Sequence, residues 1–164
     1  MKINITVGFP ESRWEDYKKI RIQALQDVPQ AFLDDIDHAE SEPESFWVER
    51  AKKVTFAEID EKVVGIVGFY QEQKVKQKHI ANVVGVYVLP EYRGMKIGYQ
   101  LLVKVLEEIK KNEEIKVINL GVVDTQKAAM KLYKSFGFIE VGKIRYAVNV
   151  NGQYFDEYLM QMYL

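Results

Sequence analysis

The chain has 164 residues, of which 48% are hydrophobic and 29% charged, a composition typical of a folded domain and not of a disordered chain. Its 23 Lys and Arg residues against 24 Asp and Glu residues give a formal net charge of −1, which provides no overall field for holding nucleic acid or an anionic membrane. Cysteine is absent and only two histidines occur, so disulfides, thiolate metal sites and a centre of several His ligands are excluded. Neither a signal peptide nor an apolar run of about 20 residues is evident, and we expect one soluble, cytoplasmic domain over residues 1–164.

Two helices are predicted in the first third of the chain. Ser12-Arg-Trp-Glu15 and Ser41-Glu-Pro-Glu44 both have the spacing of a capping box, in which a hydroxyl and a carboxylate satisfy unpaired amides at a helix start. Residues 34–44 between them contain six acids and neither Lys nor Arg. This segment either attracts a cationic ligand or is a solvated loop.

Strand-like runs follow Lys53. We expect strands over residues 54–59, 63–70 and 80–89, the first two joined by a turn at Asp60-Glu61 that lacks glycine. The run over residues 80–89 is nearly all apolar, which is typical of a strand buried on both faces.

The second half of the chain alternates between helical and strand patterns. The predicted elements are a helix over residues 97–111, a strand over 117–123, a helix that Asp124-Thr125 can cap and Gly137 ends, and strands over 138–150 and 154–164 around an Asn151-Gly152 turn. This order predicts a mixed α/β (α+β) domain with both parallel and antiparallel strands.

The segment Arg93-Gly-Met-Lys-Ile-Gly98, between a strand and a helix, is the best candidate for a binding site. A helix start offers unpaired N–H groups and a partial positive charge, and glycine allows an anion to approach the backbone closely. Arg93 and Lys96 add two cations. The loop matches neither the G-x-G-x-x-G fingerprint nor the Walker pattern, so taken alone it is equally compatible with an ordinary strand-to-helix turn.

Two separated segments resemble the GNAT superfamily of acyl-CoA-dependent N-acetyltransferases. Residues 86–98, Val-Tyr-Val-Leu-Pro-Glu-Tyr-Arg-Gly-Met-Lys-Ile-Gly, are similar to that family's fourth strand and its pyrophosphate loop, Q/R-x-x-G-x-G/A. Residues 129–138, Ala-Met-Lys-Leu-Tyr-Lys-Ser-Phe-Gly-Phe, are similar to its A-x-x-L-Y-x-x-x-G-F segment. The element order agrees along the whole chain and implies a twisted mixed sheet of about seven strands flanked by about four helices.

The resemblance implies an acetyl-CoA site in a cleft where the fourth and fifth strands splay apart. Its pantetheine would pair with the backbone of Val86, Tyr87 and Val88, helped by Gln126, which stands where the family has Asn. Its pyrophosphate would lie on the amides of a run of residues: Arg93, Gly94, Met95, Lys96, Ile97 and Gly98. Lys96 replaces a family glycine, and a positive φ there would be costly. Tyr133 matches the position of the acid that protonates the CoA thiolate.

The activity implied is transfer of an acetyl group to a primary amine by direct attack, without a metal. The expected acceptor and partner is a small-molecule amine (a polyamine, an amino acid or an amine antibiotic), with a homodimer left open and neither nucleic acid nor a membrane expected. The alternatives are a protein or peptide N-terminus as acceptor, or a non-catalytic acyl-CoA-binding module. The general base stays open among His79, Glu58, Asp156, Glu157 and a water relay.

Overall fold

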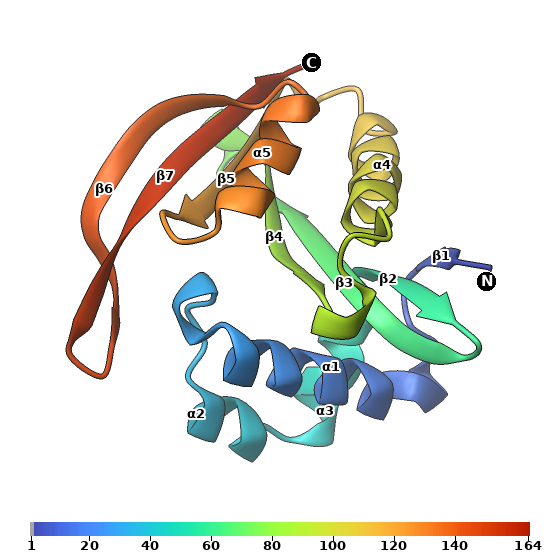
Figure 1. Cartoon of the computed structure of the whole chain (residues 1–164). Helices are drawn as coiled ribbons and strands as arrows, with labels where there is room; N and C mark the ends of the chain where they lie inside the picture. Colours follow the sequence, from blue (N-terminus) through green and yellow to red (C-terminus); the bar gives the residue numbers. More distant parts are fainter. Residues whose placement is uncertain (1) are drawn as a thin grey trace.

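The computed structural model of the chain describes residues 2–164 and is built on one twisted sheet (Figure 1). The sheet has seven strands in the order β1-β2-β3-β4-β5-β7-β6. The strands are β1 (Asn4–Val7), β2 (Val54–Ile59), β3 (Lys62–Gln71), β4 (Ile80–Val88), β5 (Val117–Val123), β6 (Ile139–Val150) and β7 (Gln153–Tyr163). All neighbours are antiparallel except β4 and β5, which are parallel, so the mixed sheet expected from the sequence is confirmed.

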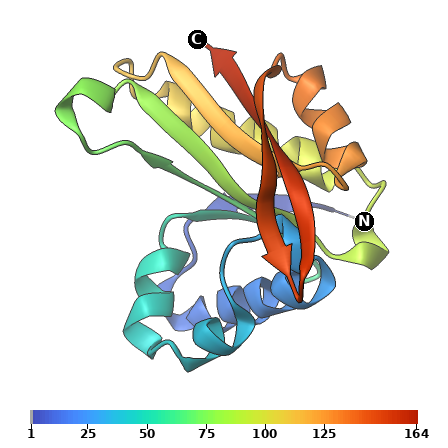
Figure 2. The same ribbon diagram turned by 90° about the vertical axis from the view of Figure 1, so that its left-hand side faces the viewer.

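Helices cover both faces of this sheet. They are α1 (Trp14–Asp27), α2 (Ile36–Ser41), α3 (Glu44–Ala51), α4 (Ile97–Lys110) and α5 (Lys127–Ser135). Four short 3-10 turns occur at η1 (Glu11–Arg13), η2 (Pro29–Ala31), η3 (Val75–Gln77) and η4 (Pro90–Tyr92). The helices α1, α2 and α3 lie on one side of the sheet, and α4 and α5 lie on the other (Figures 1 and 2).

Each face of the sheet has its own apolar layer. On the α1 side, Phe56 of β2 stacks on Phe9 at 3.8 Å between ring centroids. On the other side, Gly65 of β3 lets α4 come close, because a Cβ there would stand 3.0 Å from Leu101 Cδ1 and 3.2 Å from Ile97 Cγ2. Both layers pack closely against the strands that carry the site described below.

The strands β4 and β5 separate halfway along their length. Their ladder joins only Ile80–Asn82 to Val117–Asn119, whereas β5 remains paired with β7 as far as Val123. Gly85 has φ +65° and lies where the β3–β4 register shifts, so β4 bulges at this point. Beyond Asn82, the edge of β4 that faces β5 therefore has no strand partner within residues 2–164.

Both predicted hairpin turns are present. Asp60 and Glu61 have φ 48° and 64°, and Asn151 and Gly152 have φ 51° and 85°, which is the double positive φ of a tight hairpin. The first turn adopts this shape without glycine.

The predicted helix starts differ from those observed. No side chain caps α1, which begins at Trp14 after a 3-10 turn, so Ser12 is not a cap. Ser41 ends an additional short helix, α2, and its hydroxyl donates to the carbonyl of His38 at 2.7 Å. The N-cap residue of α5 is Gln126, and neither Asp124 nor Thr125 caps that helix.

The expectation that β4 is buried on both faces is wrong. Ala81, Val83 and Tyr87 are buried, but Val84 is 44% exposed, because the bulge and the departure of β5 open one face of the strand. Within residues 2–164, no helix has the length and apolar character needed to cross a membrane.

Candidate active site

The largest cavity of the splayed region, about 850 Å³, lies between the end of β4, the start of α4 and one face of α5. It has the size of a site for a small molecule or cofactor. Nine of the ten predicted cofactor-binding residues line it, namely Val86, Tyr87, Val88, Arg93, Gly94, Lys96, Ile97, Gly98 and Gln126. Met95 does not line it and is 36% exposed.

The first turn of α4 forms one end of this cavity. Gly94 and Lys96 both have positive φ, 81° and 60°, so Lys96 takes the left-handed conformation that its side chain disfavours. Strain of this kind costs about 1 to 3 kcal/mol and is concentrated at functional sites. Gly98 lets α5 approach, since a Cβ there would stand 3.3 Å from Leu132 Cδ2. The first amides of α4 have no acceptor inside the helix and are available to an anion.

The end of β4 is fixed by two side chains. The Arg93 guanidinium donates from Nε to the carbonyl of Val88 at 3.0 Å and lies 5.8 Å from the ring centre of Tyr87. The Tyr87 hydroxyl donates to the carboxylate of Asp27 on α1. Burial, together with Asp27, raises the pKa of Tyr87. The wall of the cavity is thus joined to α1 on the far side of the sheet.

A smaller cavity of about 70 Å³ continues from the first into the gap between β4 and β5. Gln126, Ala129 and Val86 line both cavities. Tyr133 of α5 lines the smaller one, is only 6% exposed, and packs edge-on against Phe138 at 6.1 Å between ring centroids. No side chain or backbone group within residues 2–164 hydrogen-bonds its hydroxyl. Burial raises the pKa of Tyr133, so the phenol stays protonated at neutral pH.

A third cavity of about 210 Å³ opens on the α1 side of β4. It shares Val84 and Gly85 with the small cavity, which in turn shares residues with the large one, so the three cavities adjoin in series; we call this series the cavity line. Arg21, Arg50 and Lys53 line this third cavity. The sequence contained a signal for Arg21 that was not used. Its spacing from Tyr17 and Leu25 places this cation on the buried face of α1, where an arginine is unusual.

The carboxylates considered as bases differ in their surroundings. Glu58 pairs with Arg13 at 2.6 Å, and Asp156 pairs with Lys143 at 3.0 Å. Glu157 of β7 has no ion-pair partner within residues 2–164, and its carboxylate lies over Gly121, where an added Cβ would collide with it. Gly121 lines the small cavity, and burial raises the pKa of Glu157.

His79 is not placed near the carboxylate and phenol just described. It directly precedes β4, at the end of that strand which is paired with β5, and it lines none of the three cavities.

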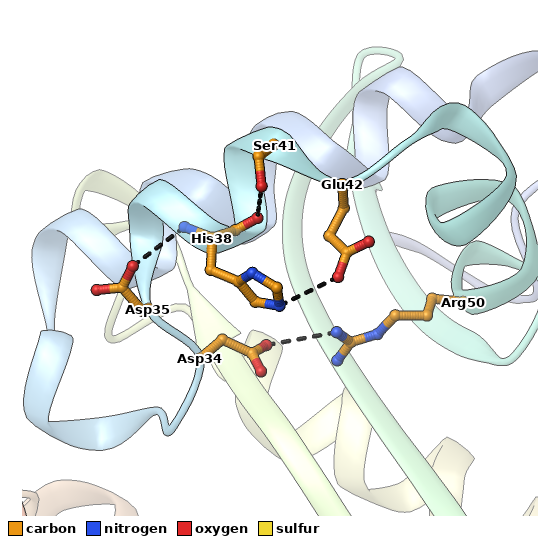
Figure 3. Close-up of polar contacts among 6 residues, drawn as sticks. All are labelled: Asp34, Asp35, His38, Ser41, Glu42 and Arg50. Atoms are coloured by element: carbon orange, nitrogen blue, oxygen red, sulfur yellow. Dashed lines mark hydrogen bonds and ion pairs between the residues drawn. The ribbon is translucent and has the colours of Figure 1, made fainter.

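The acidic segment is built into the local structure (Figure 3). Asp34 bonds Arg21 Nη2 at 2.7 Å and Arg50 Nη1 at 3.4 Å. Burial alone would raise the pKa of Asp34, but these two guanidinium groups hold it below its usual value. Asp35 accepts from the amide of His38 at 3.0 Å and caps α2, and Glu42 lies 3.2 Å from His38 Nε2.

This arrangement suits transfer of a group from an elongated anionic donor. The helix start can hold the anion, the free edge of β4 can pair with an extended chain, and a protonated phenol lies where the chain would end. A second molecule can enter through the third cavity. Among residues 2–164, no Ser, Thr, Cys or Lys side chain lines the small cavity.

Comparisons with known proteins agree with this geometry. Residues 9–138 match the family described as the acetyltransferase (GNAT) family. An N-alpha-acetyltransferase of Sulfurisphaera tokodaii is 31% identical over 93% of this chain and 96% of its own. Thialysine N-epsilon-acetyltransferase of Bos taurus is 42% identical over 32% of this chain and 30% of its own.

Solved structures share the fold at lower identity. A GNAT-family acetyltransferase of Streptococcus pneumoniae has a TM-score of 0.85 at 20% identity, with 99% of both chains covered. The yncA protein of Salmonella typhimurium, solved with its cofactor acetyl-CoA, has a TM-score of 0.81 at 19% identity, covering 99% of this chain and 94% of that one. The family match over most of the chain and the relative that is similar along its whole length lead to one conclusion: this chain belongs to the GNAT family and is an acetyltransferase.

Proposed function

We propose that this enzyme transfers the acetyl group of acetyl-CoA directly to a primary amine of a small molecule. The observation that carries the proposal is the line of three cavities, which runs from the start of α4, past Tyr133, to a separate opening on the α1 side of β4. The cofactor would enter through the large cavity and the acceptor through the third cavity. The two would meet beside the bulge of β4, because Gly85 lines both the small cavity and the third one.

The cofactor would bind through the backbone more than through side chains. The pyrophosphate would lie on the first amides of α4, where the dipole of a 14-residue helix favours an anion. The pantetheine would pair with the free edge of β4 over Val86, Tyr87 and Val88, and Gln126 lines the same cavity. Support comes from the yncA structure, which has this fold and holds acetyl-CoA.

The reaction would need one proton donor and one proton acceptor. The amine nitrogen attacks the thioester carbonyl, a C–N bond forms, and the C–S bond breaks. Tyr133 would donate its phenolic proton to the departing sulfur, and burial keeps that proton in place until then. The amine would lose its protons to a base beside the small cavity.

Glu157 is our candidate for this base. An aliphatic amine is almost wholly protonated at pH 7 and must become neutral before it can attack. Glu157 is the carboxylate over Gly121, without an ion-pair partner in the described part of the chain, and its raised pKa makes it a better proton acceptor near neutral pH. Glu58 and Asp156 already hold cations.

A peptide N-terminus is the second candidate for the acceptor. The full-length relative from Sulfurisphaera tokodaii is named an N-alpha-acetyltransferase. A peptide would have to place its first residue in the third cavity and leave the rest of its chain outside.

The test combines binding with turnover. Calorimetry should detect acetyl-CoA binding to the unmodified protein, and thiol release should follow addition of a small amine. The same assay should be run with peptides that have a free N-terminus and with their N-blocked forms as controls. No acetyl-CoA binding would refute the proposal, and turnover with free peptides but not with small amines would establish the second candidate.

A further inference from the structure

The acceptor end of the cavity line is positively charged. Arg21 from α1, Arg50 from α3 and Lys53 just after α3 all line the 210 Å³ cavity. Within residues 2–164, no acidic side chain lines it. This lining does not favour a cationic ligand, which was one of the two interpretations of the acidic segment over residues 34–44.

Arg21 is the central group of this cation cluster. It is 6% exposed, and its guanidinium lies 4.7 Å from the ring centre of Phe32. Its Nη2 bonds Asp34, but its buried Nε has no hydrogen-bond partner among residues 2–164. Its Nη1 stands 3.5 Å from the position of a Cβ on Gly85, so the guanidinium faces the bulge of β4. A buried donor without a partner is costly, and a ligand oxygen would satisfy it.

Asp34 does not neutralise the cation cluster. This one carboxylate is shared by Arg21 at 2.7 Å and Arg50 at 3.4 Å. Lys53 forms no ion pair in the described part of the chain. Three cations against one carboxylate leave two positive charges in excess beside the cavity.

We propose that the acceptor carries an anionic oxygen group, a carboxylate or another oxyanion, a few bonds away from its amine. This inference rests on the proposed function, since it assumes that the acceptor amine reaches the acetyl group in the space beside Gly85. The anion would bind Arg21 and its neighbours while the amine points past Gly85 toward the small cavity. A planar guanidinium suits an oxyanion because it can donate two parallel hydrogen bonds.

The charge of this lining also separates the acceptors expected from the sequence. A polyamine would bring further positive charge toward Arg21, Arg50 and Lys53, whereas the carboxylate of an amino acid would be attracted to them. An amino acid is therefore favoured over a polyamine among those acceptors.

The first experiment compares matched acceptors with the unmodified enzyme. Each of a set of α-, β- and γ-amino acids is assayed beside its own carboxamide, together with aminoalkylphosphonates and spermidine. We expect kcat/KM to be at least about tenfold higher for a carboxylate or phosphonate than for its uncharged partner, because a hydrogen bond to a charged group is the stronger kind. Preference for one of these two anions identifies the oxyanion. A carboxamide as good as its carboxylate, or spermidine as the best acceptor, would overturn the inference.

The second experiment removes the cations one at a time. Arg21→Gln should lower kcat/KM for the anionic acceptor by at least about tenfold, and by a larger factor than for its carboxamide. Since this change also leaves Asp34 with one partner fewer, Lys53→Gln at the exposed rim is the second variant, and it should raise KM by a few-fold. Lys52→Gln is the matched control, because Lys52 pairs with Glu49 and does not line the cavity. Equal effects of Lys52→Gln and Lys53→Gln would contradict the inference.

Binding of acetyl-CoA separates the two levels of the proposal. If the anionic-acceptor inference is wrong but the proposed function is right, acetyl-CoA should bind normally and amines should be acetylated without any preference for an anionic group. Failure of the proposed function would appear as no binding of acetyl-CoA. Normal binding of acetyl-CoA with no turnover of any anionic amine in the panel would also count against the inference.

Discussion

Replacing Tyr133 with Phe should remove the proton donor of the reaction and leave the fold intact. In Tyr133→Phe the ring can keep its edge-on contact with Phe138, 6.1 Å between centroids, and only the proton donor is lost. Because no group within residues 2–164 hydrogen-bonds this hydroxyl, its removal leaves no buried partner unsatisfied. We therefore expect the free energy of unfolding to change by less than about 1 kcal/mol.

The expected loss of turnover follows from the surroundings of Tyr133. Loss of a general acid costs about 100- to 10,000-fold in rate, or about 3 to 5 kcal/mol of transition-state stabilisation. Burial raises the pKa of this phenol, which makes it a weaker acid than a phenol in water. The penalty should consequently be near the lower end, about 100-fold in kcat.

The assay is thiol release at saturating acetyl-CoA, with a single-turnover measurement to confirm that chemistry is rate-limiting. Calorimetry should give the same acetyl-CoA affinity as for the parent. Tyr99→Phe is the control, since Tyr99 lines the large cavity but is 48% exposed and packs on Phe136, away from Tyr133. Full activity of Tyr133→Phe with chemistry rate-limiting would refute the assignment of this residue as the acid.

Three further predictions test other parts of the site. Gly98→Asp should weaken acetyl-CoA binding by about 100-fold or more in calorimetry, because it places a negative charge at the anion-binding end of α4, whereas Gly98→Ala should have a much smaller effect, since Leu132 Cδ2 would need to move only slightly. Glu157→Gln should lower kcat/KM most strongly near neutral pH. Because burial raises the pKa of Glu157, ionising this carboxyl destabilises the folded parent, and the variant should therefore gain thermal stability relative to the parent as pH rises from about 4 to 7. Arg21 and Arg50 lower the pKa of Asp34, so the contribution of this carboxylate to stability should be complete above about pH 4 and decline as pH falls further. The free energies of unfolding of Asp34→Asn and the parent, measured with denaturant, should therefore converge in acid, and a constant difference between them would contradict this.

Local patterns were enough to predict most of the strands. The run over residues 117–123 is β5 with the same bounds, and Asn151-Gly152 forms the expected turn with positive φ at both positions. These elements depend on neighbours in sequence, since alternation and turn residues act over a few positions.

Helix caps were predicted poorly because a hydroxyl can serve more than one backbone group. Ser41 has the right spacing to cap α3, yet its hydroxyl donates to the carbonyl of His38 in the last turn of α2. The alternative depends on α2, a helix of six residues, which the acid-rich composition did not suggest. A short helix of this kind is stabilised by its tertiary contacts and not by its own propensity.

The splay of β4 and β5 depends on distant parts of the chain. The apolar run over residues 80–89 looked like a strand buried on both faces, and only the resemblance to a family indicated a cleft there. The cleft forms because β5 follows β7 to Val123 while β4 bulges at Gly85. Neither the choice of partner strand nor a left-handed glycine can be deduced from the composition of β4.

The cofactor loop shows the value of combining motifs with geometry. The loop pattern alone was equally compatible with an ordinary turn. In the structure, its residues line one large cavity, except for Met95. Lys96 adopts the positive φ that its side chain makes costly, which is a feature expected at a functional position. The predicted role of this loop in binding acetyl-CoA is tested by calorimetry of the Gly98 variants.

The charge of the acceptor end shows why counting charges along a segment misleads. Residues 34–44 contain six acids and no cation, and an isolated loop of this kind would attract amines. In the fold, Asp34 reaches back to Arg21 and across to Arg50, which are 13 and 16 residues away in sequence. This pairing occupies Asp34 and holds two guanidinium groups that line the cavity, so the lining has the opposite charge to that of the segment. The net charge that a ligand meets is the charge remaining after side chains have formed ion pairs with one another. At this site Asp34 offsets one of three cations, so the net charge is positive. The same contacts that stabilise the acidic segment therefore favour an acceptor with an anionic group.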